Sequence, residues 1–87
     1  MPNSHASLGL LLEPEGQPLR AVRAERLLTI RQLAELANVA PSTIYLIENR
    51  RSTPHLAVVR RLAEALDLDP HTVAEFRRAI RLHGGRR

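Results

Sequence analysis

The sequence has no cysteine and no lysine among its 87 residues, and its aromatic side chains are one tyrosine and one phenylalanine. Without cysteine there is neither a disulfide nor a thiolate metal ligand to support the fold. With so few aromatics, the core has to be built from Leu, Ile, Val and Ala, which is typical of a small helical bundle. We therefore expect one all-α domain, because a chain of this length has room for a single core.

Membrane and catalytic signals are also missing. The apolar run Leu8–Leu12 is too short to span a bilayer, and no positively charged region precedes it. The four histidines are scattered without a metal-ligand spacing, and there is no phosphate-binding glycine loop or nucleophile motif. The carboxylates, Glu75 included, are interpreted as helix-surface and capping groups. We expect a soluble cytoplasmic protein that is not an enzyme and holds no metal or cofactor.

The net charge is +4, and all thirteen basic side chains are arginine. This balance favours a polyanionic partner such as nucleic acid or an acidic surface. The exclusive use of arginine fits a GC-rich coding genome as readily as bidentate phosphate contacts. Charge alone does not identify the partner.

Residues 29–49 have the pattern of two short helices. Apolar residues recur at helical spacing from Ile30 to Ala37, and the pattern resumes at Ile44 and Ile47. Thr29 followed by Gln32 fits a capping box at the start of the first helix.

The break between these helices has the residues of a tight turn. Ala34 is small where a crossing helix leaves little room, and Asn38 tolerates a left-handed backbone conformation. Pro41 suits the opening turn of a helix that we expect over about residues 41–49. The pattern predicts a helix-turn-helix, which makes DNA binding the leading hypothesis.

Three more helices complete the expected bundle. A first helix ends near Leu28, with Leu19 and Val22 facing inward. Thr53–Pro54 predicts the start of a fourth helix that ends near Leu66. Asp69–Pro70 predicts a fifth, stopped by glycines at 84 and 85. The inward face of this fifth helix is expected to carry Val73, Phe76 and Ile80. The expected organisation is an irregular, partly ordered arm over residues 1–18, a helical domain over 19–83 and a basic tail over 84–87.

Together these motifs resemble the helix-turn-helix domains of the phage-repressor, Cro and xenobiotic-response-element family. The resemblance covers about residues 19–82. Its carriers are Arg23, LAELA at 33–37, STIYLIEN at 42–49, TP at 53–54 and RRLAEAL at 60–66. It implies a five-helix, lambda-repressor-like bundle and a sequence-specific DNA-binding transcriptional regulator, in the first place a repressor, with the 41–49 helix in the major groove of double-stranded DNA.

The resemblance also implies roles for individual residues. A structural ion pair is expected between Arg23 and Glu48. The residues expected to contact bases are Pro41, Ser42, Tyr45 and Leu46. The residues that the resemblance places near phosphates are Thr43, Asn49 and Arg51, and Arg50 adds positive charge where the same phosphate backbone would pass.

The chain departs from the family pattern at several positions. Ile30 stands where the family often has a phosphate-binding glutamine. Leu27, Asn38 and Arg50 stand where glycine is common, and of these only asparagine readily adopts a left-handed conformation. Either the loops at Leu27 and Arg50 differ from those of the family, or they hold modest strain.

The expected partners depend on faces outside the helix-turn-helix. The stripe Val73, Phe76 and Ile80 either closes the core of the monomer or forms half of a homodimer interface, and we favour the homodimer. A dimer implies a near-palindromic operator with half-sites roughly 34 Å apart. The arm is a candidate contact for a protein partner, for example a toxin bound through Leu8–Leu12. The alternative function is a protein-interaction module of the same fold, with weak or no DNA reading.

Overall fold

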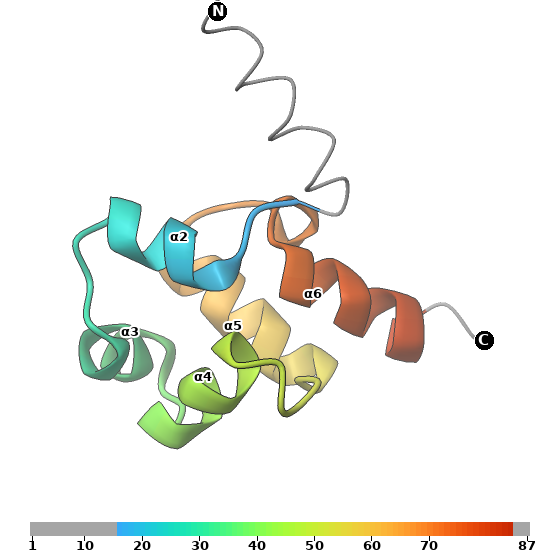
Figure 1. Cartoon of the computed structure of the whole chain (residues 1–87), viewed down its shortest axis with the longest axis horizontal. Coiled ribbons are helices and arrows are strands. Elements are labelled where there is room, and N and C mark those ends of the chain that lie inside the picture. The colour runs from blue at the N-terminus through green and yellow to red at the C-terminus, as the bar shows by residue number, and fades with distance from the viewer. Residues whose placement is uncertain (1–15, 85–87) are drawn as a thin grey trace, which may run out of the picture.

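The computed structural model of the chain describes residues 16–84, and this part is all-helical (Figure 1). Its α-helices are α2 (Leu19–Glu25), α3 (Ile30–Ala37), α4 (Pro41–Glu48), α5 (Leu56–Leu66) and α6 (Ala74–Ala79). A short 3-10 helix, η1 (Pro70–Thr72), precedes α6, and a π-helical segment, η2 (Ile80–Gly84), follows it. The predicted all-α, five-helix bundle is confirmed. In projection α5 lies in the middle, with the other helices around it (Figure 1).

Two helix starts follow the predicted local signals. The Thr29 hydroxyl accepts from the Gln32 backbone N–H at 3.0 Å, and the Gln32 side-chain oxygen accepts from the Thr29 N–H at 2.9 Å. This reciprocal capping box opens α3. Pro41 is the first residue of α4 and follows an extended Ala40. An N–H at this position would have no partner within the helix, so proline costs no helical hydrogen bond there.

The predicted start of α5 at Thr53–Pro54 is wrong. The helix begins at Leu56, and His55 precedes it in an extended conformation without a capping side-chain bond. Pro54 is buried and lines a small cavity together with Ile47 and Glu75. The proline therefore serves as a packing residue of the loop instead of starting the helix.

The signal at Asp69–Pro70 belongs to η1 and not to a long fifth helix. The Asp69 carboxylate accepts from the His71 backbone N–H at 2.9 Å and caps this single turn. Val73 then takes an extended conformation, with φ −108° and ψ 126°, so α6 begins only at Ala74.

Val73 is extended because it pairs with Gln17 in an isolated parallel bridge. The Gln17 N–H donates to the Thr72 carbonyl at 2.9 Å, and the Ala74 N–H donates to the Gln17 carbonyl at 2.8 Å. Residues 17 and 18, which the sequence analysis assigns to the arm, are therefore part of the folded domain. Residues 1–15 of the predicted arm, Leu8–Leu12 among them, lie outside the described residues, as do residues 85–87 of the predicted basic tail.

Helices α2 to α5 all end at a residue in the left-handed conformation. After α4, the Arg50 N–H donates to the Ile47 carbonyl at 3.1 Å and the Arg51 N–H donates to the Leu46 carbonyl at 2.9 Å. This paired closure normally uses glycine at its left-handed position. In this chain the left-handed position after each of these helices is held by a residue other than glycine, with φ between 56° and 59°. These residues are Leu27, Asn38, Arg50 and Asp67. Asn38 was expected to adopt this conformation. Leu27 and Arg50 do so too, so of the two alternatives the loops hold the strain of a left-handed conformation at a residue other than glycine.

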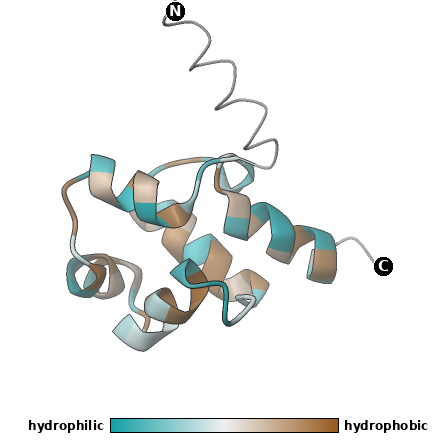
Figure 2. Ribbon diagram, in the orientation of Figure 1, coloured by the Kyte–Doolittle hydropathy of each residue, from teal (hydrophilic) through white to brown (hydrophobic). Residues whose placement is uncertain are grey.

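The hydrophobic core lies where the helices face one another, and hydrophilic residues alternate with hydrophobic ones along each helix (Figure 2). The largest fully buried side chains are Leu19, Leu33, Ile44, Ile47, Leu62, Leu66, Val73 and Phe76. Burial of Ile44 and Ile47 fixes the inner face of α4 against this core. The opposite face of α4 therefore points outward.

Candidate nucleic-acid interface

Helices α3 and α4 pack against each other across a short turn. Asn38 has φ 59° and ψ 49°, and the Val39 N–H donates to the Ala34 carbonyl at 3.0 Å, which closes the end of α3. Ala34 is 2% exposed beneath this crossing. A small buried side chain and a left-handed turn thus set the angle between the two helices, as the sequence predicts for a helix-turn-helix.

The outer face of α4 carries the four residues expected to contact bases. Pro41 and Ser42 are exposed in its first turn, while Tyr45 is 51% and Leu46 38% exposed in the next. Tyrosine and serine hydroxyls both donate and accept hydrogen bonds, whereas proline and leucine offer apolar contact, for example to a thymine methyl. The face is chemically suited to reading bases with few polar groups.

The residues expected near phosphates lie along and beyond α4. Thr43 is half-buried on the helix, and Asn49 and Arg51 are exposed at its end. The Asn49 side-chain amide donates to the Tyr45 carbonyl at 2.8 Å, and this carbonyl also accepts from the Asn49 backbone N–H at 3.1 Å. The Arg51 side chain stands directly after this cap, so its positive charge lies at the carboxyl end of the helix.

Arg23 and Glu48 form the expected ion pair. The Arg23 Nε donates to Glu48 Oε2 at 2.7 Å, and Nη2 donates to Oε1 at 3.0 Å. Nη1 of Arg23 donates to the Leu28 carbonyl at 2.9 Å. These bonds to Glu48 are the main reason why the pKa of the Arg23 guanidinium is raised above its ordinary value, although burial acts in the opposite direction. One guanidinium thus joins α2, the loop after it and the last turn of α4.

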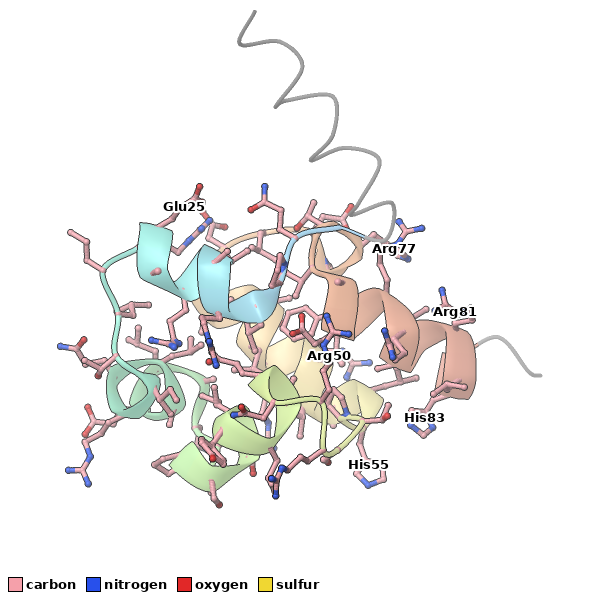
Figure 3. The ribbon with its side chains drawn as sticks, in the orientation of Figure 1. Glu25, Arg50, His55, Arg77, Arg81 and His83 are labelled. Carbon is pink, nitrogen blue, oxygen red and sulfur yellow. The ribbon has the colours of Figure 1, made fainter. Side chains whose placement is uncertain are left out.

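Arg50 has a partner that the sequence analysis does not foresee. Its Nε donates to Glu75 Oε2 at 3.2 Å, so the Arg50 side chain extends from the loop after α4 toward the start of α6 (Figure 3). Glu75 is 4% exposed, so its interpretation as a helix-surface group is wrong, whereas a capping role is met at the start of α2. Its other oxygen accepts from the Leu19 backbone N–H at 2.8 Å. Both partners are distant in sequence, and no local signal marks this carboxylate as buried.

The stripe on the last predicted helix divides between core and surface. Val73 and Phe76 have no exposed surface and pack within the domain, whereas Ile80 is partly exposed. Of the three residues proposed for a dimer face, only Ile80 therefore retains surface for contact with a second copy. Val73 and Phe76 close the core of the monomer, which is the other alternative left open above.

Residues 16–84 also lack two kinds of feature. Within them, no group of three His, Asp or Glu side chains has an arrangement that would hold a metal ion. None of the helices in this part of the chain has the length and hydropathy needed to cross a membrane.

Comparison with known proteins places this geometry in a family. A family model described as "Helix-turn-helix domain" matches residues 16–76. The "HTH-type transcriptional repressor RghR" of Bacillus subtilis (strain 168) is 45% identical over 58 residues, which cover 66% of this chain and 43% of that protein. The "Uncharacterized HTH-type transcriptional regulator RghRB" of the same organism is 43% identical over 56 residues, which cover 63% of this chain and 40% of that protein.

The chain thus spans less than half the length of these two curated relatives. No solved structure shows significant similarity to it. The matched region contains α2 to α5, the turn between α3 and α4, and the Arg23–Glu48 pair. The chain belongs to the helix-turn-helix domain family, in line with its resemblance to the phage-repressor, Cro and xenobiotic-response-element group.

Proposed function

We propose that this chain is a DNA-binding transcriptional regulator that inserts α4 into the major groove of duplex DNA. The observation that carries the proposal is the two-sided character of α4. Ile44 and Ile47 are buried, while Ser42, Tyr45 and Leu46 face outward on a helix packed against its neighbours. Pro41, Ser42, Tyr45 and Leu46 contact base edges in this proposal, with Tyr45 as the long polar reader.

Phosphate contacts anchor the domain on either side of the groove. Thr43, Asn49, Arg50 and Arg51 lie along and just beyond α4, where the backbone of a bound duplex passes. Such contacts add affinity without sequence information and make binding depend strongly on salt. They compensate for the small number of polar side chains that face the bases.

We propose repression as the regulatory outcome, since one relative is named a transcriptional repressor. A bound domain of this size blocks other proteins from the same stretch of DNA, and the proposal needs no catalytic step. It places the protein in the cytoplasm, with the DNA that it binds. A homodimer remains part of the proposal, with Ile80 as a contributor to its interface, and sedimentation velocity of the free protein tests it.

Selection of bound sequences from a randomised duplex library, at fixed near-physiological salt, tests the function directly. Enrichment of a near-palindromic sequence supports a sequence-reading dimer and supplies the operator. Enrichment of one asymmetric half-site supports DNA reading by a monomer and counts against the dimer. No enrichment by a folded helical protein overturns the proposal.

A protein-interaction module is the second candidate, because Tyr45 and Leu46 expose apolar surface at the centre of the same face. Under this alternative, DNA affinity is weak and independent of sequence. Substitution of Tyr45 by Ala then abolishes a protein contact, while neutralising Arg50 and Arg51 has little effect. An antitoxin that binds its toxin through the arm and DNA through α4 unites both functions.

A further inference from the structure

The carboxylate of Glu75 lies at the junction of three elements. Oε1 accepts from the backbone N–H of Leu19 at 2.8 Å, and Oε2 accepts from Arg50 Nε at 3.2 Å. Leu19 opens α2, whose preceding residue, Pro18, supplies no capping side-chain bond. Glu75 therefore satisfies an amide that would otherwise be unpaired at a buried helix start. A single side chain of α6 joins the start of α2 to the end of α4.

Arg50 is held at both its backbone and its side chain. Its N–H closes the end of α4 on the Ile47 carbonyl, and its φ of 57° turns the chain away from the helix. The side chain remains 44% exposed although Nε is bound to Glu75. A guanidinium has further N–H donors on its terminal nitrogens, and these suit a phosphate. Glu75 thus fixes a cation that is still partly open to solvent beside the exposed Arg51.

We propose that Glu75 is a positioning residue for DNA binding, which holds the Arg50 guanidinium so that its terminal N–H donors meet a phosphate of the duplex. The inference rests on the proposed DNA-binding function and adds to it a residue that lies outside the helix-turn-helix. A long side chain that is already ordered loses less conformational freedom on binding. An untethered Arg50 would lose that freedom at each encounter with DNA.

Whether neutralising Glu75 weakens or strengthens DNA binding distinguishes a positioning role from a purely electrostatic one. Glu75 is negative and lies one side chain away from the proposed phosphate contact, so its charge alone weakens DNA binding. Neutralising it would then strengthen binding. If its role is to hold Arg50, neutralising it weakens binding instead. The two explanations therefore predict opposite changes for the same substitution.

The experiment measures the dissociation constants of the full chain for a labelled duplex recovered by selection on the wild-type protein. Glu75→Gln keeps one oxygen for the Leu19 N–H but presents an amide that cannot hold Arg50 in the same way. Arg50→Gln removes the cation, and the double variant tests whether Glu75 acts through it. Glu64→Gln, at an exposed carboxylate of α5, is the matched control for the loss of one negative charge.

A further variant leaves the buried carboxylate untouched. Arg50→Lys keeps the charge, but one ammonium cannot bind Glu75 and a phosphate through separate edges of a plane. Circular dichroism and thermal unfolding establish that each variant is folded at the temperature of the binding assay. The exchange rate of the Arg50 Hε proton in the free protein reports the tether itself.

The inference expects Glu75→Gln and Arg50→Lys to weaken binding by about two- to tenfold, the range expected for ordering one long side chain. Glu75→Gln should keep the salt dependence of the wild type and add little to Arg50→Gln, which lowers the slope by roughly one. The Arg50 Hε proton should exchange faster once Glu75 is replaced.

Three results overturn the inference. Glu75→Gln could bind as tightly as the wild type or more tightly, or it could weaken binding equally with and without Arg50, which would leave only a structural role. Arg50→Lys could also bind as the wild type does. If the wild-type protein enriches a DNA sequence from the library, each of these outcomes overturns the role of Glu75 but not the proposed function. A wild-type protein that binds no duplex overturns both.

Discussion

Arg23 and Glu48 face each other as two planar forks, with Nε opposite Oε2 and Nη2 opposite Oε1. The Glu48 side chain is 1% exposed and that of Arg23 is 16% exposed, so both charges are largely removed from water. Each therefore depends on the other to offset its desolvation. Because Glu48 is the last residue of α4, this pair fixes the orientation of the helix proposed to read DNA.

The first prediction concerns the geometry of that pair. Arg23→Lys keeps the charge but removes the fork and the bond to the Leu28 carbonyl, so we expect a loss of about 2 kcal/mol in the free energy of unfolding, less than full removal of a buried partner. Urea denaturation measures it. Arg20→Lys is the control, because Arg20 Nε lies 3.8 Å from Glu48 on a side chain that is 64% exposed. The control should change stability by less than about 0.5 kcal/mol. Equal effects of the two substitutions would contradict this assignment.

The second prediction concerns the strained turn after α2. Leu27 has φ 58° and is 88% exposed, so it adopts a left-handed conformation with little packing in return. We expect Leu27→Gly to raise the free energy of unfolding by about 0.5–1 kcal/mol. Leu36→Gly, at a 61% exposed position within α3, should lower it by about 1 kcal/mol. A destabilising Leu27→Gly would show that the leucine side chain has a packing role.

The third prediction concerns pH. Hydrogen bonds from His71, first of all from its backbone N–H, lower the pKa of the Asp69 carboxyl below its ordinary value. The stabilisation by the charged cap is therefore fully present above the unfolded pKa, about 3.9, and is lost as the pH falls through the folded pKa.

Titration of the Asp69 carboxyl carbon by NMR, in the folded chain and in urea, measures this difference. The folded chain should give the lower pKa. Asp69→Asn keeps a capping oxygen but lacks the charge, so the variant should be less stable than the wild type near pH 7. At a pH low enough to protonate Asp69 in the wild type, the two proteins should be equally stable. A folded pKa at or above the unfolded one would rule out the charged cap.

The fourth prediction separates base reading from phosphate binding. Tyr45→Ala should flatten the preference at one or two operator positions, by about 1–3 kcal/mol per base pair, with little change in salt dependence. Arg51→Gln should weaken binding to all sequences alike and lower the salt slope by roughly one. Binding to a panel of single-base operator variants, at several salt concentrations, measures both. A uniform loss on Tyr45→Ala would remove this residue from the base-reading set.

The features that could be predicted from the sequence are those decided within one helical turn. The capping box of Thr29 and Gln32, the proline that opens α4 and the left-handed Asn38 all depend on neighbours a few residues away. Such features can be recognised in short stretches of sequence. The ion pair of Arg23 and Glu48 spans 25 residues and was accessible only through the family resemblance.

The features that were missed depend on distant partners. Pro54 has the sequence signature of a helix start, but its burial against the end of α4 delays α5 by two residues. Val73 fits a helical stripe, but pairing with Gln17 makes it extended. Glu75 is buried because Leu19 and Arg50 supply its partners from 56 and 25 residues away. No pattern along the chain reports such contacts.

The pairing of Gln17 with Val73 also has a consequence for the order of synthesis. This bridge and the bond between Glu75 and Leu19 join the beginning of the described domain to its last helix. A nascent chain emerging from the ribosome cannot make these contacts until residues 72–75 have left the exit tunnel, and closing so long a loop has an entropic cost. The start of α2 and the end of α4 thus acquire their shared anchor only when the domain is almost fully translated. Incomplete chains would contain α4 without the contacts of Glu75 that help to orient it.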